Sequence, residues 1–257
     1  MLGGTVTLEY EGEPGARIAV ITISSPEVRN ALTPGMGRDL VALCDRIDAD
    51  DQVISAVIRG ANGTFCSGGD TREWTVISDA ASDEAYRSTS AVYESFARFG
   101  RLSVPSIAAI RGAAVGAGLN IALAADLRIC AEDARLIAGF GQIGIHPGGG
   151  FFALLGRTGS REAAAAVGLF NQELSGRRAV EAGLAWEALP DAEVEARALD
   201  LARQAVPNGR LGRITTRSFR LELGPPAVSL AAALELERGN QMWSQSERIR
   251  FTKADRS

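Results

Sequence analysis

Two glycine-rich turns, each directly after a strand-like apolar run, hold the residues best suited to chemistry. The first, residues 65–70, reads Phe-Cys-Ser-Gly-Gly-Asp and follows the run at 53–58. The second, residues 111–118, reads Arg-Gly-Ala-Ala-Val-Gly-Ala-Gly and follows the run at 106–110. Small residues leave backbone N–H groups uncovered, and a helix starting there adds unpaired donors and a positive dipole end. Two such turns side by side would hold an oxygen that gains negative charge during a reaction.

The commoner glycine-rich sites do not match these turns. A dinucleotide-binding turn would need glycine three residues after Gly118, where Ile121 stands, and no Lys-Ser or Lys-Thr pair follows as in a phosphate-binding loop. Ser67 lacks the Gly-x-Ser-x-Gly frame of a nucleophile elbow. Ordinary strand–turn–helix packing remains an explanation for either turn alone.

Taken together and in order, the motifs resemble the crotonase superfamily, also called the enoyl-CoA hydratase/isomerase family. The resemblance covers about residues 18–189. The motifs are Ser-Pro-Glu-Val-Arg-Asn-Ala-Leu at 25–32, the turn at 65–70, Gly-Ala-Gly at 116–118 with Asp126, Ile-Gly-Ile-His-Pro-Gly-Gly-Gly at 143–150, and Ala-Val-Glu-Ala-Gly-Leu-Ala at 179–185.

The resemblance implies an α/β fold of the ClpP/crotonase type, a spiral of β-β-α units with a C-terminal helical region. Residues 1–190 would form the spiral core with the CoA and oxyanion sites, and residues 191–257 a helical trimerisation region. The implied partner is an acyl-CoA thioester of fatty acid metabolism, with coenzyme A as part of the substrate and no separate cofactor or metal. The implied assembly is a homotrimer or a dimer of trimers.

The same resemblance assigns roles to residues of both turns. The amides of Gly69 and Ala117 would hold the thioester oxygen; the family commonly has glycine at the second position, and alanine keeps the N–H. The CoA nucleotide would lie against residues 26–31 and 66–70. Arg29 would contact its adenine or a phosphate, although a solvated surface arginine is an equal alternative. The substrate-binding residues implied are Arg29, Ala31, Ser67, Gly68, Asp70, Gly116 and Phe140.

Three acid/base positions of relatives hold other residues here. Hydratases of the family use two glutamates as a paired acid and base, and this chain has Asn120 and Phe140 at those positions. The isomerase branch, which the Gly-Ala-Gly-x-Asn and Ile-Gly-Ile-x-Pro patterns resemble, uses an aspartate directly after the proline. Gly148 stands there. Hydration by the two-glutamate route is therefore not expected.

His146, the one histidine of the chain, is the first candidate for a proton shuttle between α- and γ-carbons. Pro147 biases it towards an extended conformation. The alternative is a loop-packing histidine. Glu73 is a second candidate if its segment folds over the pocket, against a solvated helix residue.

Aromatic and acidic residues near the motifs have less specific interpretations. Phe140, Trp74, Phe151 and Phe152 would line or close the acyl pocket, although aromatic residues are equally expected in the core. Asp70 and Asp126 are expected to play structural roles, with Asp70 orienting its turn.

The leading hypothesis is an enzyme that moves a double bond in an acyl-CoA thioester through a stabilised enolate. The alternatives are hydration by a non-standard route, and hydrolysis, decarboxylation or C–C cleavage of a CoA thioester. A further alternative is an acyl-CoA-binding subunit without catalysis, motivated by Asn120, Phe140 and Gly148.

Composition narrows the class of protein. The 257 residues, 46% hydrophobic, suffice for one sizeable core, and a net charge of −4 argues against nucleic-acid binding. No basic block or long apolar run indicates a membrane partner. Three widely spaced cysteines, Cys44, Cys66 and Cys130, fit reduced thiols in the cytoplasm, and their spacing matches no metal site.

Short strands alternating with helices must position the two turns. Apolar and polar residues alternate at 17–24 as in a half-buried strand, and 53–58, 106–110 and 127–131 are further strands. Thr33 and Pro34 predict a helix start, and that helix ends before Asp50. The other predicted helices are 83–99, 119–125, 161–169, 176–182, 193–206, 211–221 and 228–248, and the chain is expected to be all-helical after about residue 155.

Overall fold

Six strands in the order β1-β2-β3-β4-β6-β9 form the main sheet of the computed structural model, which describes residues 3–70, 72, 82–207 and 209–223. β1 pairs antiparallel with β2, and the remaining neighbours pair in parallel. Three strands form a second sheet in the order β5-β7-β8. The strands are β1 (Thr5–Glu11), β2 (Arg17–Ser24), β3 (Val53–Gly60), β4 (Ser106–Ile110), β5 (Ala113–Val115), β6 (Leu127–Ala131), β7 (Arg135–Ile137), β8 (Leu174–Ser175) and β9 (Glu187–Leu189).

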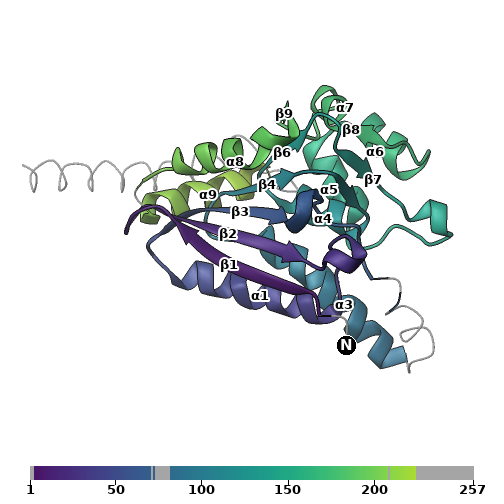
Figure 1. The fold of residues 1–257 in the computed structure, drawn as a ribbon, viewed down its shortest axis with the longest axis horizontal. Helices are drawn as coiled ribbons and strands as arrows, with labels where there is room; N and C mark the ends of the chain where they lie inside the picture. Colours follow the sequence, from purple (N-terminus) through teal and green to yellow (C-terminus); the bar gives the residue numbers. More distant parts are fainter. Residues whose placement is uncertain (1–2, 71, 73–81, 208, 224–257) are drawn as a thin grey trace, which may run out of the picture.

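Helices cover both sides of the main sheet. In Figure 1, α1 lies below β1 and β2, whereas α8 lies on the other side, against β4 and β6. The helices are α1 (Pro34–Ala49), α3 (Ser82–Phe99), α4 (Ala117–Ala124), α5 (Phe151–Thr158), α6 (Arg161–Gly168), α7 (Gly176–Glu181), α8 (Val194–Arg203) and α9 (Gly209–Leu223). Short 3-10 turns occupy Pro26–Val28, Ala61–Gly63, Gly141–Ile143 and Asp191–Glu193.

The chain repeats a β-β-α unit. In β4-β5-α4 and again in β6-β7-α5, the first strand enters the main sheet and the second enters the three-stranded sheet. β4 pairs with β6 and β5 pairs with β7, both in parallel, so the two units are stacked. The α/β architecture with a helical C-terminal region, predicted from the sequence, is confirmed.

Most predicted elements are present. The strands at 106–110 and 127–131 have the predicted bounds, and the strand at 53–58 extends to Gly60. Thr33 caps α1, because its Oγ1 accepts a hydrogen bond from the Met36 amide (3.2 Å), and α1 ends at Ala49 as predicted. The helices predicted from 83–99 to 211–221 occur with ends shifted by a few residues. The helix predicted at 228–248 lies outside the described residues.

The prediction that β2 is half-buried is wrong. Residues 18–21 are buried on both faces of the strand, and only Arg17, Thr22 and Ser24 are partly exposed. The reason is tertiary: β2 has a strand on each side, and α8 and α1 lie on opposite faces.

The prediction of an all-helical chain after residue 155 is also wrong. β9 continues the main sheet by pairing with β6, and β8 pairs with β7. Strands of two and three residues are too short to show an alternating pattern, and their partners lie far away in the sequence.

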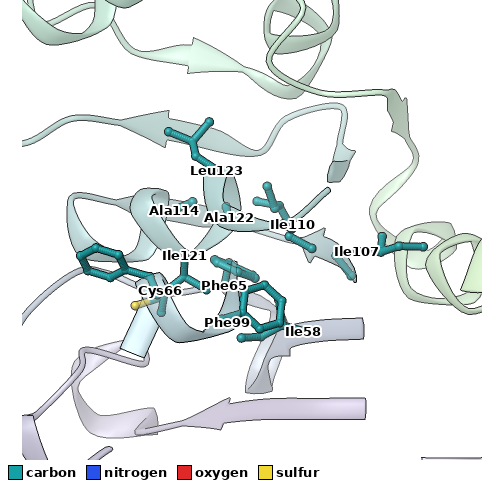
Figure 2. Packing of buried hydrophobic residues seen from close by; sticks show 14 of the residues in the cluster. Ile58, Phe65, Cys66, Phe99, Ile107, Ile110, Ala114, Ile121, Ala122 and Leu123 are labelled. Carbon is teal, nitrogen blue, oxygen red and sulfur yellow. The ribbon is translucent and has the colours of Figure 1, made fainter. Parts of the chain in front are cut away.

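One hydrophobic core connects these elements. Figure 2 shows side chains from β3, α3, β4 and α4, with Phe99 and Ile121 among them, gathered in one cluster with Phe65 of the first turn. Val194 and Ala198 of α8 belong to the same core, and the division of the chain at residue 190 stays a prediction. Within the described residues, no helix has the length and apolar character needed to span a membrane.

Candidate active site

The two glycine-rich turns lie against each other. The Cys66 amide donates to the Ala113 carbonyl (3.0 Å), and the Val115 amide donates to the Cys66 carbonyl (2.9 Å). A Cβ atom on Gly68 would lie 3.0 Å from the Val115 oxygen and 3.9 Å from the Ala117 nitrogen. The first turn therefore meets the start of α4, as expected from the sequence.

Two backbone donors are unpaired where the turns meet. In the part of the chain that the structure describes, neither the Gly69 amide nor the Ala117 amide donates a hydrogen bond, whereas the neighbouring Asp70 amide donates to the Leu32 carbonyl (2.9 Å). Ala117 is the first residue of α4, where a helix has no carbonyl for its amides and its dipole is positive. An oxygen with growing negative charge would be stabilised by two such donors.

Glycine is required at three positions of this junction. Gly68 has φ 103° and Gly116 has φ 51°, both in the region that favours glycine. A Cβ atom on Gly118 would lie 2.4 Å from the Cys66 carbonyl oxygen. The glycines thus permit the close approach that brings the two amides together.

The thiol of Cys66 lies inside the first turn. It is fully buried, 3.5 Å from the Gly68 nitrogen, and burial raises its pKa to about 12. A thiol with that pKa is protonated at neutral pH and is a poor nucleophile. Cys66 is therefore part of the scaffold of the turn.

The segment at 26–31 packs on the first turn, as the CoA hypothesis requires. The Ser67 amide donates to the Arg29 carbonyl (3.1 Å), its hydroxyl donates to the Val28 carbonyl (2.7 Å), and the Leu32 amide donates to the Gly68 carbonyl (2.8 Å). Ala31 is buried. The guanidinium of Arg29 is exposed and has no hydrogen bond or ion pair to any described residue.

Asn30 is a residue whose role the sequence did not reveal. It is fully buried at φ 61°, its Oδ1 accepts from the Ser25 amide (2.9 Å), and its Nδ2 donates to the Ala61 and Thr64 carbonyls (both 2.8 Å). These bonds fix the 25–31 segment to the end of β3. The only sign of this role in the sequence was that Asn30 lies within the motif at 25–32.

Asp70 closes the first turn. Its buried carboxylate accepts from the Arg72 backbone amide (3.0 Å) and forms an ion pair with the Arg72 guanidinium (2.5 Å). The hydrogen bond from the Arg72 side chain is the main reason that the pKa of Asp70 lies below its usual value. An ionised, paired carboxylate fits the expected structural role.

The two positions at which the resemblance implies glutamates in hydratases are both near the junction. Asn120 is buried, and its Nδ2 donates to the Gly148 carbonyl (3.0 Å), while its buried Oδ1 has no partner among the described residues. The Phe140 ring lies 3.7 Å from where a Cβ atom on Gly116 would be, and it packs edge-on against Phe151 (centroids 5.2 Å apart). Neither side chain transfers protons.

His146 lies in an exposed loop. Its Nδ1 lies 2.7 Å from the Pro147 carbonyl oxygen, which can only accept, so Nδ1 carries the proton and Nε2 has the free lone pair of a base. Among the described residues, the ring makes no hydrogen bond to Asn120 or to the two free amides. The contact of this loop with α4 is made by its backbone, because the Gly148 carbonyl accepts the hydrogen bond from Asn120.

The remaining candidates divide into three groups. Glu73 and Trp74 lie outside the described residues. Phe151 is buried beside Phe140, whereas Phe152 is partly exposed and lies over Gly168 at the end of α6. Asp126 accepts from the Ser106 amide (2.8 Å) and hydroxyl (2.9 Å) and pairs with Arg220 on α9, which supports its structural role.

Comparison with known proteins gives consistent findings. The family model described as "Enoyl-CoA hydratase/isomerase" matches residues 13–244. A "probable enoyl-CoA hydratase" of Mycobacterium tuberculosis (strain ATCC 25618 / H37Rv) is 35% identical over 230 residues, which cover 83% of this chain and 89% of the relative. The "1,2-epoxyphenylacetyl-CoA isomerase" of Escherichia coli (strain K12) is 29% identical, covering 87% of this chain and 85% of that protein.

Solved structures agree with the fold. The crystal structure of a "probable enoyl-CoA hydratase/isomerase" from Mycobacterium abscessus superimposes with a TM-score of 0.84 at 26% identity, covering 98% of this chain and 95% of that chain.

Proposed function

Since the chain belongs to the enoyl-CoA hydratase/isomerase family, it is an acyl-CoA-processing enzyme, and we propose that its reaction is the movement of a double bond through a thioester enolate. The observation that carries this proposal is the pair of unpaired amides, Gly69 and Ala117, in adjacent turns, without a carboxylate at the family's hydratase positions.

The proposed mechanism uses the two amides as an oxyanion hole. The thioester carbonyl accepts hydrogen bonds from Gly69 and Ala117, and a base removes a proton from the α-carbon. The electron pair moves onto the thioester oxygen as an enolate, and the double bond shifts when a proton is added at the γ-carbon. Because the donors are fixed before the reaction, they stabilise the growing charge without reorganisation.

His146 is proposed as the base. Its Nδ1–H group is engaged by the Pro147 carbonyl, so the Nε2 lone pair is available for the α-proton. The exposed guanidinium of Arg29 is proposed to contact the adenine or a phosphate of CoA, with Ala31, Ser67, Gly68 and Asp70 forming the wall beside it. Gly116 and Phe140 are proposed to line the acyl group.

Hydration is a second candidate, because the names of several relatives contain "enoyl-CoA hydratase". The unpartnered Oδ1 of Asn120 is able to accept a hydrogen bond from a water molecule. An amide does not take up the proton of that water at neutral pH, so hydration would need another base.

The test is deuterium exchange from D2O into the α- and γ-carbons of 3-enoyl-CoA esters with short, long and aromatic acyl groups. Wild type is expected to label both carbons, and His146→Ala is expected to lose the label at both. Labelling unaffected by His146→Ala would show that another residue is the base. Tight binding of CoA esters without labelling would contradict the proposed reaction and favour the binding subunit. Release of free CoA or CO2 would favour hydrolysis or decarboxylation.

A homotrimer or dimer of trimers is proposed for the assembly, and the cytoplasm for the location. Several large apolar side chains are exposed on the single chain, including Phe170 (72%) and Trp186 (60%), which supports burial against further copies. The thiols of Cys44, Cys66 and Cys130 are free, which supports a reducing compartment. The mass in solution distinguishes a monomer, a trimer and a hexamer.

A further inference from the structure

The space beside Gly148 is already occupied by a phenol. A Cβ atom on Gly148 would lie 2.0 Å from Tyr93 Oη and 3.0 Å from Tyr93 Cζ, so no side chain fits at position 148 while Tyr93 is in place. The hydroxyl of Tyr93 thus stands where the first atom of a residue-148 side chain would be.

Two helices hold the backbone beside this hydroxyl. Tyr93 and Phe96 lie one turn apart on α3, with ring centroids separated by 5.8 Å, and Phe96 Cζ lies 2.3 Å from the Cβ position of Gly149. On the other side, Asn120 of α4 donates to the Gly148 carbonyl (3.0 Å). The glycine pair at 148–149 therefore sits between α3 and α4.

The contact with Asn120 connects the backbone beside the hydroxyl to the helix that begins at one of the free amides. Asn120 is three residues after Ala117 on α4, a rise of about 4.5 Å along the helix. The Gly148 backbone is therefore joined by one hydrogen bond to the helix whose first residue, Ala117, carries one of the two free amides.

Both polar groups beside Gly148 have unused hydrogen-bonding capacity. Tyr93 Oη has no hydrogen-bond partner among the described residues, and the buried Oδ1 of Asn120 has none either. A phenol donates and accepts, and an amide oxygen accepts. Buried polar atoms are normally paired in the working state of a protein. The buried, unpartnered Oδ1 of Asn120, next to a partly exposed phenol without a protein partner, therefore indicates a place for a substrate group.

We propose that Tyr93 is the proton donor to the γ-carbon, in the position that Gly148 leaves without a side chain. This inference rests on the proposed isomerisation. After the base has taken the α-proton, the O–H bond of Tyr93 breaks as a C–H bond forms at the γ-carbon, and the O–H electron pair stays on the phenolate oxygen. Tyr93 is 40% exposed, so water returns a proton to the phenolate, and the protonated base releases its proton to water.

Tyr93→Phe is the direct test, because it removes only a hydroxyl without a protein partner and keeps the ring against Phe96. With 3-enoyl-CoA in D2O, we expect the α-carbon to be labelled at a rate within about threefold of wild type, since the base and the amides remain. Labelling at the γ-carbon is expected to fall at least about 100-fold, the usual effect of losing a general acid. Tyr10→Phe, on β1, is the matched control and should leave both rates unchanged.

Gly148→Ala is a second variant that keeps the hydroxyl but displaces it, since the new Cβ would overlap Oη. It should also lower γ-labelling more than α-labelling. Unchanged γ-labelling in Tyr93→Phe, or an equal loss at both carbons, would overturn the role of Tyr93. The absence of α-labelling in wild type would contradict the proposed function itself, and the role of Tyr93 with it.

Discussion

The Cys66 carbonyl lies 2.4 Å from the place where a Cβ atom on Gly118 would be, a separation that real Cβ contacts do not show. A backbone carbonyl cannot turn aside as a flexible side chain does. The distance between the first turn and α4 is therefore set by the missing side chain of one glycine, and with it the spacing of the Gly69 and Ala117 amides.

Gly118→Ala is accordingly predicted to push the two turns apart. We expect a loss of unfolding free energy of about 1–3 kcal/mol, as for overpacking, together with a large loss of α-proton exchange. Gly156→Ala is the control: nothing lies within 4 Å of its Cβ position on α5, and alanine should stabilise that helix by about 0.5–1 kcal/mol. Urea denaturation of both variants is the measurement. Wild-type stability and exchange in Gly118→Ala would disprove the steric argument.

At the level of elements, α9, the last helix of the described residues, is held by arginines that reach the loops beside the main sheet. Arg213 donates to the Asp50 carbonyl (2.8 Å) at the end of α1, and Arg220 pairs with Asp126 (2.5 Å) and donates to the Val104 carbonyl (3.2 Å). These contacts join α9 to the loops that precede β3 and β4, away from the two turns.

Arg220→Ala should therefore lower the unfolding free energy and leave the rate of α-carbon exchange nearly unchanged. Removing the partner of a largely buried carboxylate is expected to lower the unfolding free energy by about 2–3 kcal/mol. Exchange at the α-carbon, per folded molecule, should stay within a few fold of wild type. Arg217→Ala, an exposed arginine on the same helix, should change neither. If Arg220→Ala melted with wild-type stability, the anchoring role would be wrong.

Helix caps and short apolar patterns in the sequence predicted the elements whose formation depends on residues close together in the chain. Thr33 and Pro34 marked the start of α1, and the apolar runs marked β4 and β6, because capping and short-range patterning act within a few residues. β9 escaped prediction because its three residues join the sheet only through β6. The motifs located the two turns, but they did not reveal that Tyr93 of α3 fills the space beside Gly148, a contact between segments far apart in the chain.

For the whole molecule, the three buried thiols link stability to pH. Burial raises the pKa of Cys44, Cys66 and Cys130 from 9.0 to about 12 in each case. Above pH 9 the unfolded chain loses these protons while the folded chain keeps them, so the unfolded state binds fewer protons and the unfolding free energy falls as pH rises. Each thiol contributes at most about 1.4 kcal/mol per pH unit across that window.

We therefore predict that the urea midpoint is lower at about pH 10.5 than at about pH 8, with no thiol contribution to the pH dependence below about pH 8. Cys44→Ala, which removes one of the three thiols, should show a smaller decrease between the two pH values than wild type. An equal decrease in wild type and Cys44→Ala would show that the Cys44 thiol does not contribute.

The central claim, that two backbone amides stabilise the enolate, is tested most directly by deleting one of them. Ala117→Pro removes the N–H at the first position of α4, where proline is well tolerated by a helix, and Ala117→Gly keeps the N–H. We predict that labelling of the α-carbon of 3-enoyl-CoA in D2O falls about 100- to 1,000-fold in Ala117→Pro and only a few fold in Ala117→Gly. Equal rates in two folded variants would contradict the oxyanion hole.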